Sequence, residues 1–319
     1  MSYHRPSNKD FFQSLEEAYT NPVTLETHKT RVKYLLELSK SNKDLYYILK
    51  HPKSYIPRIT KRYPKKVATQ KNMVTTVLSL FNHGNLACAL PDQHAEWKAH
   101  HTLLREEERA ILASNKPSEQ QQKNYITFSE IKAKFKDLKK DPQAHKMRYK
   151  SQRLCLLAFI VYQIPKRAEL GNVRITRRIS EPPSEDNYLI LRKHPHESNL
   201  VIRKYKGSGP SNPNKPPILE PLNPKFVKIL KKSLKAHPRE FLFVKRDNQP
   251  FATNQEFSHH VIRTMKSLFN GRGMGVSLIR HMYITEKVDF NTTSTAERER
   301  IAKAMGHSKN MQDRYNWIL

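Results

Sequence analysis

The sequence has few cysteines, few glycines and no long apolar run. Its 319 residues include two cysteines and eight glycines. Cys88 and Cys155 both lie among apolar neighbours, which favours buried free thiols in a reducing compartment over a disulfide. The longest apolar run, Leu154 to Tyr162, has nine residues and is too short to cross a bilayer. Because the amino end also lacks the apolar stretch of a signal peptide, we expect an intracellular protein with no membrane partner.

Acidic residues are scarce relative to basic ones. The chain has 29 aspartates and glutamates against 58 lysines and arginines, a formal net charge of +29 that is spread along the sequence. Such an excess repels itself unless a polyanion neutralises it, so nucleic acid is the expected partner. Binding through these charges should weaken steeply as salt rises. A ribosomal-type structural protein or a membrane-surface binder would account for the charge but not for the 14 tyrosines.

Signatures of metal-dependent and nucleotide-dependent enzymes are missing from the sequence. His94, His100 and His101 have loose spacing and no cysteine partners, which argues against a zinc site. No glycine-rich phosphate loop is visible. The aspartates are scattered, whereas two-metal nuclease chemistry requires them to be grouped. We therefore expect no metal and no cofactor.

Apolar periodicity divides the chain into a helical part and a mixed part. In the first part apolar residues recur at helical spacing, helices are predicted over 73–81 and 95–113, and no alternation typical of strands occurs. The polar, proline-bearing residues 115–123 are predicted to form a linker. This places a helical DNA-binding domain at 1–114 and a second domain at 124–319.

The second domain is predicted to be mainly helical with a small antiparallel sheet, an α+β fold. Thr127 or Ser129 can cap its first helix. Residues 188–191 and 200–202 are apolar runs separated by a polar segment, which indicates an antiparallel hairpin. Further helices are predicted over 154–162, 226–234, 257–268 and 296–305, and near Arg280.

Residues with reactive side chains gather towards the carboxyl end. His307 follows Gly306, which is predicted to stop the preceding helix, and Tyr315 is the only tyrosine downstream of His307. Tyrosine is a poor nucleophile at its free pKa of about 10, so it needs neighbours that stabilise its anion or accept its proton. Basic residues that can do so lie upstream, and together these residues form a set suited to phosphoryl transfer: Arg167, Lys206 and Arg280.

Residues 124–315 resemble the catalytic domain of the tyrosine recombinases, the phage-integrase superfamily. The first domain is similar in size and place to the core-binding domain of that family. The style of the motifs resembles enzymes of mobile elements and DNA viruses. The residues that carry the resemblance are Pro165-Lys166-Arg167-Ala168-Glu169-Leu170, Leu278-Ile279-Arg280-His281, and Ala304-Met305-Gly306-His307-Ser308 followed by Tyr315.

The resemblance implies a chemistry and a set of roles. In this family a tyrosine attacks a DNA phosphate, forms a 3′-phosphotyrosyl link and releases a 5′-hydroxyl without metal or nucleotide. It implies Tyr315 as nucleophile, with His307 assisting with protons and charge. Arg167 and Arg280 would hold the non-bridging phosphate oxygens, and Lys206 would protonate the leaving oxygen. Lys204 is the nearest rival to Lys206 for that role.

The same resemblance implies partners and a setting. The partner would be double-stranded DNA, bound by a homotetramer on two DNA sites, and the reaction would be site-specific recombination or integration. The protein would lie with DNA in the host nucleus or cytoplasm, or with a virion.

The sequence departs from the family pattern at several positions. Glu169, the acidic residue after the first arginine, follows at two residues where three is usual. Tyr315 follows the histidine at eight residues where nine is commoner. Ser277 stands three residues before Arg280, where histidine or lysine is normal, and it carries no charge. His281 cannot replace it, because adjacent helical positions point about 100° apart. A packed, supporting role is expected for His281.

Two other functions stay open at this point. A type IB topoisomerase, which resembles this family in fold and nucleophile, would relax supercoils as a monomer. A catalytically silent DNA-binding protein could retain the fold, and Ser277 and the short spacing before Tyr315 favour that alternative.

Overall fold

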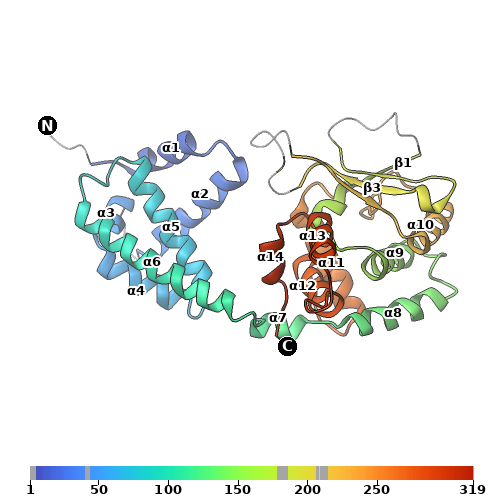
Figure 1. Cartoon of the computed structure of the whole chain (residues 1–319). Helices are drawn as coiled ribbons and strands as arrows, with labels where there is room; N and C mark the ends of the chain where they lie inside the picture. The colour runs from blue at the N-terminus through green and yellow to red at the C-terminus, as the bar shows by residue number, and fades with distance from the viewer. Residues whose placement is uncertain (1–4, 40–43, 178–185, 206–207, 209–214, 319) are drawn as a thin grey trace. The chain divides into compact units, whose positions relative to one another are not determined.

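The computed structural model describes residues 5–39, 44–177, 186–205, 208 and 215–318. The chain divides into two compact units, Met1–Ser114 and Asn115–Leu319 (Figure 1). Within 115–123, where the sequence suggested a linker, a capping box on Ser118 starts a short helix. Among the described residues, no helix is both long enough and apolar enough to cross a membrane.

The first unit is a bundle of helices, and none of its described residues is in a strand. Its core is built around α5, which buries residues on most of its surface, and Trp97 of α6 donates its indole N–H to the carbonyl of Leu49 (3.1 Å). The helices are α1 (Asn8–Ala18), α2 (Pro22–Glu37), α3 (Leu45–Lys50), α4 (Pro52–Arg62), α5 (Val67–His83) and α6 (Pro91–Ala113).

The second unit combines helices with one small sheet, as the α+β prediction requires. Its helices are α7 (Glu119–Asn124), α8 (Phe128–Lys140), α9 (Arg148–Tyr162), α10 (Pro224–Ala236), α11 (Asn254–Leu268), α12 (Val276–Lys287), α13 (Thr295–Ala304) and α14 (Lys309–Asp313). Two 3₁₀ segments are η1 (Ala168–Asn172) and η2 (Pro195–Glu197), and the strands are β1 (Arg174–Thr176), β2 (Tyr188–Ile190), β3 (Asn199–Ile202) and β4 (Ile218–Pro221).

The sheet is mixed rather than purely antiparallel. Its order is β1-β2-β3-β4; the predicted hairpin is the antiparallel pair β2-β3, and β4 continues it antiparallel to β3. β1, however, runs parallel to β2. The two outer strands escaped the sequence pattern because neither is a continuous apolar run: β1 contains no buried residue, and β4 alternates buried and exposed residues.

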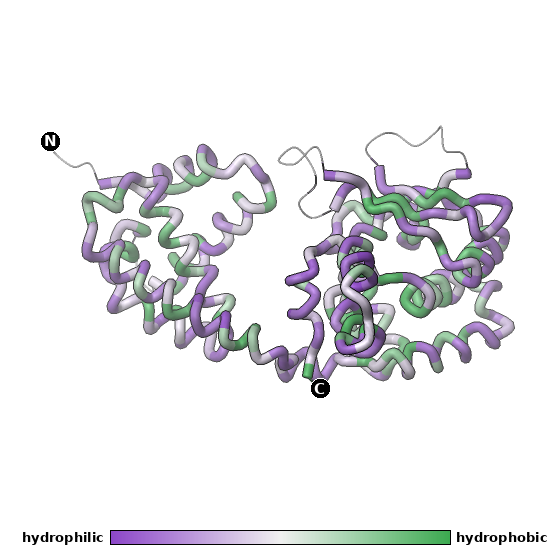
Figure 2. Tube along the Cα trace, in the orientation of Figure 1, coloured by the Kyte–Doolittle hydropathy of each residue, from purple (hydrophilic) through white to green (hydrophobic). Residues whose placement is uncertain are grey.

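Helix α9 is the centre of the second unit's core. Its residues 154–160 are all buried, and it packs against α8 and α10. Figure 2 shows this apolar helix close to the apolar strands of the sheet.

The start of helix α8 is capped by Thr127 and not by Ser129. The Thr127 hydroxyl accepts the N–H of Glu130, while the Glu130 carboxylate accepts the N–H of Thr127.

The expectation of two buried thiols is half wrong. Both cysteines are free, and Cys155 is buried in α9, but Cys88 is exposed. Cys88 lies in the turn between α5 and α6, where Leu86 and Leu90 point into the core. In an irregular turn, apolar sequence neighbours do not fix the direction of the residue between them.

Candidate active site

The carboxyl end of α13 forms a tight turn that organises the site. Gly306 adopts φ +70°, which favours glycine, and its N–H donates to the carbonyl of Lys303 (3.0 Å). The N–H of His307 donates to the carbonyl of Ala302 (3.0 Å). These two bonds make a Schellman motif, so the helix ends at Met305 and His307 begins the next segment.

Two arginines from distant segments donate to the carbonyls of this turn. Arg280, on α12, donates to the carbonyl of Met305 (3.2 Å), and Arg167, just before η1, donates to the carbonyl of Gly306 (3.3 Å). The last carbonyls of a helix have no partner within it, so the guanidinium groups satisfy acceptors that the fold leaves open. The turn therefore brings Arg167, Arg280 and His307 together.

Tyr315 lies against this group. Its side chain is only 9% exposed and packs in an apolar cluster with residues of α12 and α13. The guanidinium carbon of Arg280 lies 4.8 Å from the centre of its ring, and the His307 ring centre lies at 5.2 Å. Arg280 is itself 1% exposed, and burial lowers its pKa to about 10, a shift that the neighbouring Tyr315 opposes.

His307 presents one nitrogen to the chain and the other to the site. Its Nδ1 lies 2.9 Å from the carbonyl oxygen of Ser308, so Nδ1 carries the proton and donates. Its Nε2 is buried and has no hydrogen-bond partner among the described residues, and the same is true of Nε of Arg280. Burial, together with Arg280 and Arg167, lowers the pKa of His307 to about 4. His307 is therefore a neutral imidazole with an open acceptor.

His281 and Ser277 occupy different surroundings from these residues. The His281 ring stacks on Trp317 (centroids 4.0 Å apart), and its Nδ1 lies 3.3 Å from the backbone carbonyl oxygen of Tyr315. Burial lowers the pKa of His281 to about 4. His281 thus holds the chain at the tyrosine and two residues after it. Ser277 lies exposed on the first turn of α12.

Sequence reasoning missed a buried ion pair beside the first arginine. Lys166, 4% exposed, donates to the carboxylate of Glu220 on β4 and to the carbonyl of Ala304 on α13. Glu169 is also buried, at 6% exposed; burial raises its pKa, while Arg167, Arg280 and Lys166 oppose that shift. The arginines thus stand in a buried network of alternating charge. The lysine next to Arg167 was a possible signal of this ion pair, but its partner Glu220 lies 54 residues from it in the sequence.

The lysine region is only partly described. Lys206 lies outside the described residues. Lys204 is exposed, and its backbone N–H and carbonyl bind the Asn187 side chain at the end of the hairpin. Tyr205 donates its hydroxyl to the carbonyl of Pro216 (2.8 Å). No group of three or more metal-ligating side chains occurs within the parts of the chain that the structure describes.

Breaking the Lys166–Glu220 pair on one side should destabilise the protein. Lys166→Met or Glu220→Leu should each lower the free energy of unfolding by roughly 3–5 kcal/mol, because the remaining buried charge loses its partner. The double variant Lys166→Met, Glu220→Leu should lose less than either single variant. Urea unfolding followed by circular dichroism measures this, and losses that simply add would contradict the coupling.

Acid should weaken the fold through its buried histidines. The pKa values of His281 and His307 are about 4 in the folded state and near 6.5 in an unfolded chain. Between these values the unfolded chain binds more protons, so stability should fall as pH drops from about 6.5 to about 4 and stay level above that window.

Glutamine replacements test this pH dependence. His281→Gln and His307→Gln should each reduce the loss of unfolding free energy between pH 7.5 and pH 5 by on the order of 1 kcal/mol, allowing for partial exposure. The same change at the exposed His196 should leave the slope unaltered. An unchanged slope in both test variants would contradict the assignment.

Comparisons with known proteins find similarity to solved structures. No family model and no curated protein matches the sequence. Among solved structures, the chain is similar to the crystal structure of XerA recombinase, with 14% sequence identity and a TM-score of 0.42 over 98% of this chain and 93% of that chain. At this TM-score we infer nothing about activity from the likeness.

Proposed function

We propose that this protein cleaves and rejoins DNA through a covalent 3′-phosphotyrosyl intermediate, as a site-specific recombinase. The observation that carries the proposal is that Arg280 and His307 lie against the Tyr315 ring while Arg167 binds the same turn beside them. A nucleophilic hydroxyl, two cations and a neutral base acceptor are the parts that transesterification of a phosphodiester requires. The net charge of +29 supports DNA as the substrate.

The proposed step requires no cofactor, because each bond that forms replaces one that breaks. The Tyr315 oxygen attacks the phosphorus, the bond from phosphorus to the 5′-oxygen breaks, and the tyrosine proton moves to a base. The leaving 5′-oxygen takes a proton from a general acid, and attack by a 5′-hydroxyl reverses the step. Arg167 and Arg280 stabilise the charge that grows on the non-bridging oxygens.

His307 is better suited to accept a proton than to donate one. Its Nδ1 proton is used on Ser308, and its lowered pKa keeps Nε2 unprotonated at neutral pH. We therefore assign Nε2 of His307 the role of hydrogen-bond acceptor for the Tyr315 hydroxyl, over that of a hydrogen-bond donor to phosphate. His281 positions the tyrosine through its backbone and stays outside the reaction.

Phosphate binding requires a side-chain movement. Arg280 is 1% exposed beneath the Tyr315 ring, so a DNA phosphate reaches its guanidinium only when the ring moves aside. Tyr315 follows the five-residue helix α14, which ends at Asp313, so only short elements hold the segment that carries its ring. We propose that DNA binding draws Tyr315 off Arg280 and places phosphate between them.

Replacing the nucleophile should abolish covalent linkage and leave DNA binding intact. Wild-type protein is incubated with supercoiled DNA of broad sequence content and denatured, and protein–DNA adducts are measured. Tyr315→Phe should form no adduct, while its DNA affinity stays within about twofold because no phosphate-binding charge is lost. Tyr283→Phe, a change to a second tyrosine packed against the same apolar cluster, is the matched control and should form the adduct normally.

Each outcome of this assay selects one function. An adduct on the 3′-phosphate that needs Tyr315 supports the proposal, and strand exchange between two sites then distinguishes a recombinase from a topoisomerase that relaxes DNA as a monomer. Adducts that persist in Tyr315→Phe would overturn the nucleophile. Tight DNA binding with no adduct in the wild type would favour the silent DNA-binding protein.

A sulfur-substituted substrate identifies the general acid. Lys206→Ala should slow cleavage of ordinary DNA by about 10²–10⁴-fold, the usual contribution of a positioned acid. DNA with sulfur at the 5′-bridging position should restore the rate, because a thiolate leaves without a proton. Lys204→Ala is the control and should be slowed little on either substrate; the reverse pattern would move the role to Lys204.

A further inference from the structure

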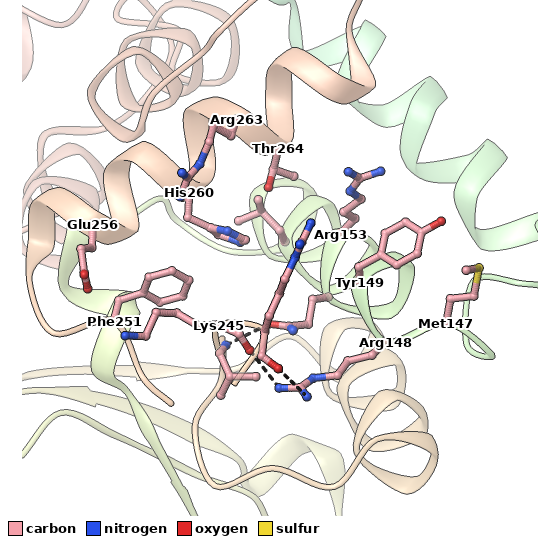
Figure 3. Close-up of a pocket in the computed structure, with 14 residues that line it drawn as sticks. Met147, Arg148, Tyr149, Arg153, Lys245, Phe251, Glu256, His260, Arg263 and Thr264 are labelled. Carbon is pink, nitrogen blue, oxygen red and sulfur yellow. Dashed lines mark hydrogen bonds between the residues drawn. The ribbon is translucent and has the colours of Figure 1, made fainter. Parts of the chain in front are cut away.

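A basic pocket with an apolar floor lies in the second unit, between the start of α9, the middle of α11 and the loop that precedes α11 (Figure 3). Its volume is about 1010 Å³, large enough for several side chains of a partner. Leu156, Val244 and Phe251 form apolar walls, and all three are buried. Met147 and Tyr149 stand at its edge with 42% and 48% of their surface exposed. The proposed chemistry uses none of these residues.

The charges around this pocket are mostly positive. Glu256 is the only carboxylate in the lining, and it is occupied in accepting the N–H of Ala252 (2.8 Å). Among the described residues, no ion pair is formed by any of the five cations of the lining, which are Arg148, Arg153, Lys245, Arg246 and Arg263.

The contacts that these cations do make leave their charge uncompensated. Arg148 donates to the carbonyls of Lys245 and Arg246 and to the side chain of Asn248, which are all neutral acceptors. Arg153 lies over the Tyr149 ring, 5.1 Å from its centre. The field acts on His260 in the lining, whose pKa burial lowers to about 4 with the help of Arg263 and Arg153. Such a concentration of like charge favours an anionic partner.

The complementary surface occurs in the first unit, at the end of α6. Glu106-Glu107-Glu108 is the only run of three acidic residues in the sequence. Glu108 pairs with Lys71, but Glu106 and Glu107 are exposed. Leu103 and Ile111 are 63% and 51% exposed. Because residues four apart share a helix face, Leu103, Glu107 and Ile111 form one acidic and apolar stripe.

We propose that the end of α6, residues 103–111, docks into the basic pocket of a second copy of this chain. The apolar stripe would cover the exposed edge at Met147 and Tyr149, and the two free glutamates would face Arg246 and Arg263 at the rim. Both surfaces expose large apolar side chains, which is unusual for surfaces that stay in water. Duplex DNA would neutralise the rim but would leave the apolar floor without a partner.

The attachment of α6 favours a second copy over the chain's own pocket. Helix α6 ends at Ala113, and the carbonyl of Asn115, two residues later, accepts the N–H of Ile318 (2.9 Å). The tether between α6 and the second unit is therefore short, whereas a second copy meets α6 without any tether. The contact joins two different surfaces, so it is head-to-tail and builds rings or chains.

Charge reversal on exposed residues tests the contact in the full chain without DNA, by sedimentation velocity over a range of protein concentrations. Wild type should associate more as concentration rises and less as salt rises. Glu106→Lys with Glu107→Lys, and separately Arg246→Glu with Arg263→Glu, should each weaken self-association about tenfold or more, because like charges then face each other. Lys225→Glu with Lys228→Glu on exposed positions of α10 changes the net charge as the pocket variant does, and should leave association unaltered.

Mixing the two variants gives the sharpest result. In an equimolar mixture the intact α6 can meet the intact pocket and the reversed α6 can meet the reversed pocket, so the mixture should regain the association that each variant alone has lost. A chain with all four reversals has the wild-type net charge and should recover association. Circular dichroism verifies that each variant is folded.

Three results would overturn the proposal. The first is a wild type that stays monomeric at every concentration. The second is a change in sedimentation that is independent of concentration, which would place α6 in its own pocket. The third is a pocket variant that self-associates as tightly as the wild type. Because the assay contains no DNA and requires no cleavage, it is independent of the proposed recombinase activity.

Discussion

The turn after α13 is the constraint on which the site depends. A helix leaves its last carbonyls without partners, and here the carbonyls of Met305 and Gly306 are satisfied by two guanidinium groups from other segments. The hydrogen bonds that close the helix thus also fix the positions of the cations. Gly306 is required for this geometry: its φ is +70°, and a Cβ there would lie 3.3 Å from the Ile218 side chain on β4. One backbone conformation sets the relative places of α12, α13, β4 and the start of η1.

Bringing these cations together costs solvation, and the fold offsets that cost with acids and dipoles. Arg280 and Lys166 are nearly inaccessible, and burial lowers the pKa of each. Glu220 pairs directly with Lys166, while Glu169 lies within the electric field of Lys166, Arg167 and Arg280. These two acids reduce the repulsion among the three cations, but the cluster keeps a net positive charge. An excess of this kind suits a site that must attract an anion.

The sequence predicted the parts of the molecule that depend on local rules. Long periodic segments such as α6 and α11 are helices, and Gly306 ends a helix, because amphipathic spacing and glycine's access to positive φ act within a few residues. The pairing of Lys166 with Glu220 could not be predicted in this way, since it depends on how β4 meets α13. The same limit applies to β1, which lies parallel to β2 through a pairing that no short pattern encodes, and to Cys88, whose exposure is set by a turn.

Exposure separates the basic residues of this chain into two kinds. The buried ones, Lys166 and Arg280, are held by carbonyls or carboxylates and have fixed positions. Exposed ones such as Arg246 and Arg263 form no ion pair among the described residues, so their energy depends on what binds from outside. Salt screens only the second kind strongly. Raising ionic strength should therefore weaken the proposed DNA binding and the proposed contacts between copies, while the buried network beneath Tyr315 stays intact. Assembly and site architecture are in this sense separable properties of one highly basic sequence.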